Sequence, residues 1–140
     1  ANELNLLDGS SSGTIVNNKS VIYDTNGGIL TQAITINQET ATLNVNKEIN
    51  FNEGSDFYFE LSGNITLTNP INESVGQQGK IVFKTNGSNT VNWATGGKWH
   101  FNGGSAPSLT GSSGSYDMFN YYVVASSVIL VSYIQDFRQI

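Results

Sequence analysis

The sequence predicts an all-β protein, a jelly-roll-like antiparallel sandwich, on three observations. Short segments that alternate apolar and polar residues recur about every 8–12 residues, which is typical of sandwiches and barrels. Gly, Asn and Ser separate these segments and supply turn chemistry. Charged residues make up only 12% of the chain, against roughly 25% in soluble domains. We therefore predict about ten short strands and almost no helix.

The N-terminal residues predict an arm rather than part of the sandwich. Residues 1–9 place Leu4 and Leu7 on one face of a short helical turn. So short a helix is not stable alone in water, and we expect it to dock on a neighbouring surface. We place the arm at residues 1–30, where it anchors or aligns a trimer, and the sandwich at residues 31–140.

The strand pattern is clearest from Ala41 onward. The segment ATLNVNKEINF alternates apolar and polar residues, except that Lys47 falls on the apolar side and marks a turn or a bulge. Five further strands are predicted at residues 56–62, 64–68, 80–85, 90–93 and 98–101.

The chain ends in a predicted hairpin with apolar residues on both sides. Its strands, up to Ala125 and from Val128, meet at the pair Ser126-Ser127. Side chains alternate between the two faces of a strand. On the first strand one face is predicted to carry Tyr116, Met118, Tyr122 and Val124, and the other Phe119, Tyr121, Val123 and Ala125. On the second strand one face is predicted to carry Val128, Leu130 and Ile134, and the other Ile129, Val131, Tyr133 and Phe137. Such a hairpin requires cover on both sides, from a second layer of the same chain or from another subunit.

The second half of the chain resembles a C-terminal β-domain found in structural proteins of tailed bacteriophages. The matching elements are the GQQG at 76–79, the strand 81–83, Trp93, Trp99, the GGSAPSLT run at 103–110 and the aromatic hairpin at 116–137. The segment NITLTNPIN resembles the first strand of the same unit. The segment ELNLLDG is similar to segments that precede such domains in phage fibres.

This resemblance implies a virion component on the outer surface of the capsid or tail. Such proteins are typically homotrimers that attach to other virion proteins or to the cell surface. The length fits a capsid decoration protein or a small head or tail fibre. The physical pattern agrees, because three chains packed about one axis would cover the hairpin. An obligate interface of this kind commonly buries more than ~2,000 Å².

The titratable residues do not form a convergent catalytic set. His100 is the one histidine and the chain has no cysteine, so a zinc site lacks its further ligands, and we interpret His100 as a strand residue beside Trp99. Asp56, Glu60 and the nearby Glu53 could form a glycosidase pair or a calcium site, but their polar strand face favours a solvated surface. We expect no enzyme, no catalytic or metal-binding residue and no cofactor.

Other partner classes are excluded by charge and hydropathy. The net charge is −5 and the six basic residues are scattered, so no nucleic-acid surface is expected. No apolar run approaches the ~20 residues that span a bilayer, so we expect no membrane insertion. The pairs Gly96-Gly97 and Gly103-Gly104 open no helix and carry no Lys-Ser/Thr, which favours turns over phosphate binding.

The aromatic residues leave one alternative function open. Exposed aromatic rings on a β-sandwich could stack on sugars and make the chain a carbohydrate-binding, host-receptor-binding module at a fibre tip. The residues concerned are Trp93, Trp99, Tyr121, Tyr122 and Tyr133. Their spacing favours packing inside the sandwich or at a subunit interface.

Overall fold

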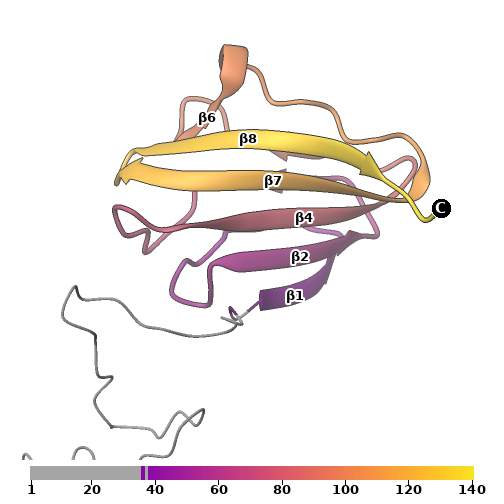
Figure 1. The fold of residues 1–140 in the computed structure, drawn as a ribbon, viewed down its shortest axis with the longest axis horizontal. Helices are drawn as coiled ribbons and strands as arrows, with labels where there is room; N and C mark the ends of the chain where they lie inside the picture. Colours follow the sequence, from indigo (N-terminus) through magenta and orange to yellow (C-terminus); the bar gives the residue numbers. More distant parts are fainter. Residues whose placement is uncertain (1–35, 37) are drawn as a thin grey trace, which may run out of the picture. The chain divides into compact units, whose positions relative to one another are not determined.

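The computed structural model describes residue 36 and residues 38–140 (Figure 1). It contains strands β1 (Gln38–Leu43), β2 (Asp56–Leu61), β3 (Ile65–Leu67), β4 (Gln78–Asn86), β5 (Val91–Trp93), β6 (Trp99–Phe101), β7 (Ser113–Ala125) and β8 (Val128–Phe137), with a 3-10 turn, η2, at Asn102–Gly104. The all-β prediction is confirmed for this part of the chain. The predicted arm at residues 1–30 lies outside the described residues.

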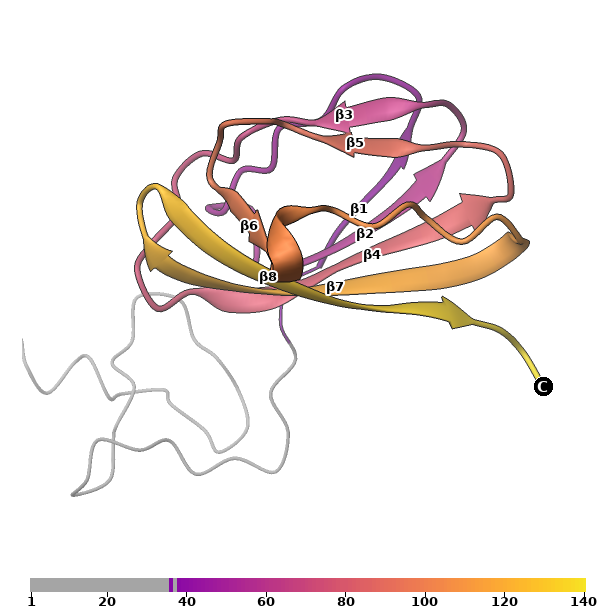
Figure 2. The same cartoon turned by 90° about the horizontal axis from the view of Figure 1, so that it is seen from above.

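The strands form two layers of unequal size. Six strands make a large sheet in the order β1-β2-β4-β7-β8-β6, and β3 pairs with β5 in a second sheet. Figure 2 shows β3 and β5 lying over one side of the large sheet. We call that side the inner face and the opposite side the outer face.

The strand pairing is mixed, which corrects the prediction of an antiparallel sandwich. Four pairs are parallel: β1–β2, β2–β4, β3–β5 and β6–β8. Only β4–β7 and β7–β8 are antiparallel among the named strands. The cause is the path of the chain, which passes between the two sheets and returns to each in the same direction. The jelly-roll arrangement as such stays a prediction.

Asparagine side chains brace the parallel strands across the turns. The Oδ1 atom of Asn46 accepts the backbone N–H of Thr66 at 2.8 Å, and that of Asn64 accepts Thr90 at 2.9 Å. These two bonds join residues 20 and 26 positions apart. These separations are unequal, so the parallel pairing of the strands does not require a fixed repeat length in the sequence.

The core between the layers is largely aromatic. The largest side chains with less than 2% exposure include Phe57, Phe59, Phe83 and Phe119. Trp93 of the small sheet packs edge-on against Phe83, with ring centroids 6.4 Å apart, and lies 5.1 Å from Phe119. Burial of such large rings is the main favourable contribution to the stability of this sandwich.

The long strand predicted from Ala41 is interrupted. β1 ends at Leu43, the chain bends, and Val45 is 66% exposed. Lys47 itself forms an isolated parallel bridge with Leu67 of β3, so the interruption lies at Asn44 and Val45 and not at Lys47, where a turn or bulge was predicted. Ile49 and Phe51 are buried as the alternation suggested, although they lie in irregular backbone.

The GQQG segment is a junction that ties β4 to the chain before β2. The Nε2 atom of Gln77 donates to the carbonyl of Phe51 at 3.1 Å. A Cβ atom on Gly79 would lie 1.8 Å from the carbonyl oxygen of Ser55. That same oxygen accepts the hydroxyl of Tyr121 at 2.7 Å. Glycine is therefore required at position 79 for a close backbone approach, not for a turn.

We predict that Gly79→Ala destabilises the fold, because the added methyl group meets backbone atoms that cannot move independently. The expected loss in the free energy of unfolding is about 1–3 kcal/mol, measured by urea denaturation. Gly111→Ala is the matched control, since a Cβ atom there meets nothing within 4 Å. Equal stability of the two variants would contradict the junction.

Candidate functional site

The terminal hairpin forms as predicted and one of its sides is fully packed. β7 and β8 are antiparallel and joined at Ser126-Ser127. The inward side chains Phe119, Tyr121, Val123, Ile129 and Val131 are all less than 5% exposed. The large sheet places them against the second layer, so the predicted burial of this side is confirmed.

The other side of the hairpin is exposed in the described chain. Its apolar residues Tyr116, Tyr122, Val124, Leu130, Ile134 and Phe137 retain between 36% and 51% of their accessible surface. The hairpin requires cover on both sides, and residues 36 and 38–140 cover only its inner side. A contiguous group of exposed apolar side chains on a sheet is typical of an interaction surface. We take this outer face as the candidate functional site.

Phe137 lies on the opposite side from the one predicted. The register pairs it with Tyr116 of β7, and directly paired residues share a face of a sheet. A bulge between Tyr116 and Met118 shifts the alternation by one residue. Phe137 thus joins the exposed side, whereas Tyr133 stays on the inner side and packs 6.0 Å from the ring of Phe119.

The outer face carries an apolar band that crosses several strands. One row consists of the register partners Tyr58, Val82, Met118 and Ile134, taken from β2, β4, β7 and β8. Tyr116 and Phe137 form the next row, and the ring of Tyr116 stacks 6.4 Å from that of Tyr58. These six residues are called the apolar band below.

The charged side chains around this band balance one another. Lys84 pairs with Glu60 at 3.0 Å, and the carboxylate of Asp56 accepts the backbone N–H of Lys80. The hydroxyl of Tyr58 donates to Glu60 at 2.8 Å. This bond, followed by the one from Lys84, lowers the pKa of Glu60. Burial, and then the Glu60 carboxylate, raises the pKa of Tyr58 to about 12.

A hollow of 490 Å³ lies beside the band, where β4, β7, β8 and β6 meet. Its lining residues are Gln78, His100, Phe101, Asn102, Asn120, Tyr121, Tyr122, Leu130, Val131 and Ser132. The volume is within the range of roughly 300–1,000 Å³ that is usual for small-molecule sites. A second hollow of 310 Å³ shares Gln78, Asn120 and Tyr121 with it and continues toward Asp56 and Lys80.

The titratable candidates from the sequence do not converge. His100 is exposed and its Nδ1 lies 2.8 Å from the carbonyl oxygen of Lys98. Asp56 and Glu60 lie on β2 in contact with lysines of β4, and Glu53 accepts a bond from Asn50. Within the described residues, no group of three or more His, Cys, Asp or Glu side chains is placed to hold a metal ion.

The aromatic candidates divide between core and surface. Trp93 and Trp99 are less than 10% exposed and Tyr121 is 3% exposed, so packing is confirmed for these three. The tryptophans therefore provide no exposed platform for a sugar. Tyr122 and Tyr133 retain 46% and 41% of their surface, and only Tyr122 of these two lines the hollow.

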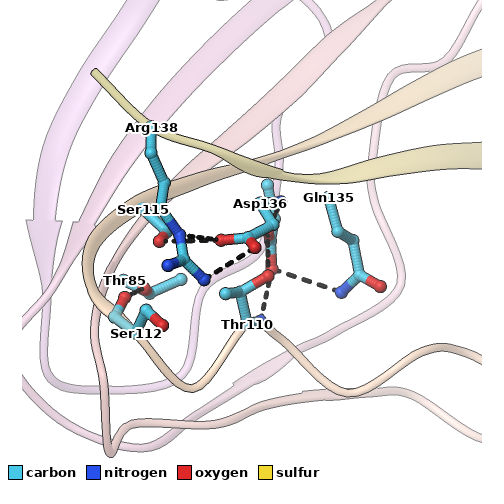
Figure 3. A network of polar contacts seen from close by, with 8 residues as sticks. Thr85, Thr110, Ser112, Ser115, Gln135, Asp136 and Arg138 are labelled. Carbon is cyan, nitrogen blue, oxygen red and sulfur yellow. Dashed lines mark hydrogen bonds and ion pairs between the residues drawn. The ribbon is translucent and has the colours of Figure 1, made fainter. Parts of the chain in front are cut away.

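Asp117 is a buried carboxylate that the sequence analysis did not single out. Its partners Thr110, Gln135 and Asp136 are labelled in Figure 3. Asp117 is 0% exposed and lies between the inward-facing Ser115 and Phe119 on β7. It accepts the N–H of Thr110 at 2.6 Å, the hydroxyl of Thr110 at 2.7 Å and the N–H of Asp136 at 2.9 Å. The Nε2 atom of Gln135 adds a further donor at 3.2 Å.

This network fixes the end of the GGSAPSLT run against the hairpin. A carboxylate whose oxygens already accept four hydrogen bonds is held in place and is a poor general base. Nearby, Arg138 donates to Asp136, which lowers the pKa of that carboxyl group. The one signal available in the sequence was an acidic residue at an inward position of the hairpin, which requires buried partners.

Comparisons of the chain with protein-family models, with curated proteins and with solved structures find no match. The resemblance to phage structural proteins therefore stays a prediction from sequence motifs. Among the described residues, no helix has the length and apolar character needed to cross a lipid bilayer.

We predict that Asp117→Asn destabilises the protein. The substitution replaces one carboxylate oxygen by an NH₂ group, which cannot accept the hydrogen bonds that the N–H and O–H groups around it donate. The expected loss in the free energy of unfolding is about 1–3 kcal/mol, measured by chemical denaturation at neutral pH. The same substitution at Asp136, whose side chain is 44% exposed, is the control and should cost less. A larger loss at Asp136 would show that the network is not the stabilising element.

We also predict that the stability falls at alkaline pH through Tyr121. Burial raises the pKa of its hydroxyl, so the unfolded chain loses this proton first and stability declines as the pH rises above ~10. Between about pH 9 and pH 11 the free energy of unfolding should fall by about 1 kcal/mol more in the unmodified chain than in Tyr121→Phe. Parallel pH profiles of the two proteins would disprove this.

Proposed function

We propose that this chain is a structural component of a bacteriophage virion, a trimeric capsid decoration protein or a head or tail fibre protein that acts by protein–protein assembly. It is not an enzyme in this proposal and needs no cofactor. The observation that carries the proposal is the apolar band on the outer face. The bacteriophage setting rests on the resemblance of the GQQG and GGSAPSLT segments to phage β-domains.

The composition of the band supports burial against protein rather than exposure to water. Ile134 and Phe137 are 51% and 44% exposed, and Met118 and Val82 lie between them and β2. Aromatic residues and Met are enriched at protein interfaces, whereas exposed strands of soluble monomers usually carry polar residues. An apolar row that follows the register of four strands gives a continuous apolar surface, which suits contact with another protein surface.

The charge distribution supports contact between identical copies. The outer face of β2 and β4 carries two acidic residues, Asp56 and Glu60, and two basic residues, Lys80 and Lys84, while the chain as a whole has a net charge of −5. The excess negative charge therefore lies elsewhere. Identical copies that meet through this face avoid the repulsion that like charges would cause.

The internal bracing suits a protein that must persist on a particle surface. The asparagine bonds, the Ser55 junction and the Asp117 network each join segments distant in sequence. Little of this stability depends on exposed ion pairs, which contribute only about 0–1 kcal/mol each and weaken in salt. Such a scaffold presents the apolar band without the need for a conformational change.

We predict that the full chain forms a trimer at micromolar concentration and that Ile134→Asp shifts it toward monomer. A charge placed in the band must be buried without a partner for the contact to form, which is costly. Native mass spectrometry and sedimentation velocity measure the change, and circular dichroism confirms that the variant is folded.

Val45→Asp is the matched control, because Val45 is 66% exposed and lies in the bend after β1, outside the large sheet. This variant should keep the oligomeric state of the unmodified chain. The proposed assembly would be overturned if the unmodified protein stays monomeric. It would also be overturned if the Ile134→Asp protein still forms trimers. Labelling of the protein on intact particles and imaging them would test the virion location separately.

A further inference from the structure

We propose that the hollow at the junction of β4, β7, β8 and β6 is a binding site for a neutral oligosaccharide. The site is distinct from the apolar band, and the inference does not depend on the proposed virion role. It also differs from a tryptophan platform, since both tryptophans are buried in the core.

The lining of the hollow has the functional groups that recognise sugar hydroxyls. It contains three primary amides, from Gln78, Asn102 and Asn120, together with the hydroxyl group of Ser132 and the ring of Tyr122. Amides and hydroxyls both donate and accept hydrogen bonds, as the hydroxyl groups of a sugar do. An exposed aromatic ring beside them offers an apolar surface for the C–H face of a pyranose.

Most polar side chains of the lining have no hydrogen-bond partner within residues 36 and 38–140. Two lining side chains make hydrogen bonds within the described chain: Tyr121 donates to Ser55, and His100 bonds through Nδ1 to Lys98. A carbonyl oxygen can only accept a hydrogen bond, so Nδ1 of His100 is the nitrogen that carries the proton in this contact. In that tautomer of the neutral ring, Nε2 can accept a hydrogen bond from a hydroxyl group of a ligand. The side chains of Gln78, Asn120 and Ser132 make no hydrogen bond with another described residue.

The absence of charge from the lining defines the class of ligand. None of the ten lining residues is Lys, Arg, Asp or Glu. A phosphate, sulfate or carboxylate would lack the cationic partner that it usually requires, and a cationic ligand would lack a carboxylate. A purely apolar ligand would leave the amides without partners. A neutral polyhydroxylated molecule has no charge that needs a partner, and its hydroxyl groups can pair with the amides.

The site is placed on strands, which hold the side chains rigidly. Gln78 pairs with Tyr122, Asn120 pairs with Ser132, and Leu130 pairs with His100 across neighbouring strands. Rigid elements reduce the entropy that is lost when a ligand binds. The adjoining hollow shares three of the lining residues but carries the charged residues Lys80 and Asp56. We therefore confine the proposed site to the larger, uncharged hollow.

The test uses the full chain and an array of immobilised oligosaccharides built from hexoses and N-acetylhexosamines, with sialylated and sulfated glycans on the same array. We expect binding to one or more neutral glycans, followed by titration with the free neutral oligosaccharide by calorimetry. Tyr122→Ala and Gln78→Ala should each weaken that binding about tenfold or more, since loss of a central contact commonly costs above ~1 kcal/mol.

Tyr133→Ala is the matched control, because Tyr133 is similarly exposed on the same hairpin but does not line the hollow. It should leave glycan affinity unchanged. Two variants are used so that a failure of one to fold, seen by circular dichroism, leaves the other informative. The proposal is overturned by a lack of binding to every neutral glycan at millimolar concentration, by binding that requires sialate or sulfate, or by affinity that neither variant lowers. Sedimentation of the same samples reports the oligomeric state, so failure of the trimer is recognised separately.

Discussion

The large sheet has two faces and the described chain covers only one of them. β3 and β5 lie over the inner face, where Trp93, Phe83 and Phe119 pack together. A two-stranded layer is too small to wrap around a six-stranded sheet, so residues 36 and 38–140 leave the apolar band on the outer face partly exposed. Because exposed apolar area is unfavourable in water, this constraint makes contact with another surface the expected state of the molecule.

The unusual composition has a structural use. Asparagine side chains at the turns accept backbone N–H groups from residues 20 to 29 positions further along the chain. These bonds keep neighbouring turns in register. A short hairpin turn has the same effect on the register of two antiparallel strands. The glycine at position 79 and the buried carboxylate of Asp117 add two fixed junctions. Few charged residues are needed, since hydrogen bonds to the backbone hold the loops.

The outer face combines two kinds of surface that suit different partners. The apolar band crosses four strands, whereas the neighbouring hollow is lined by amides, a hydroxyl group and an imidazole. The hollow begins at the row of Asn120 and Ser132, directly beside the band's row of Met118 and Ile134, and the two regions share no residue. Assembly through the band and recognition of a saccharide in the hollow are therefore compatible on one molecule.

The sequence by itself determined the all-β class and the terminal hairpin with its turn at Ser126-Ser127, because period-2 alternation and turn residues are local signals. It favoured the burial of Trp93 and Trp99, which the structure then showed. It also showed that the hairpin is apolar on both sides. Only the tertiary structure decided the parallel pairing, the bulge that moves Phe137 to the outer face, the partners of Asp117 and the grouping of the hollow's residues. These features depend on register between segments with unequal spacing, and a register of that kind leaves no periodic trace in the chain.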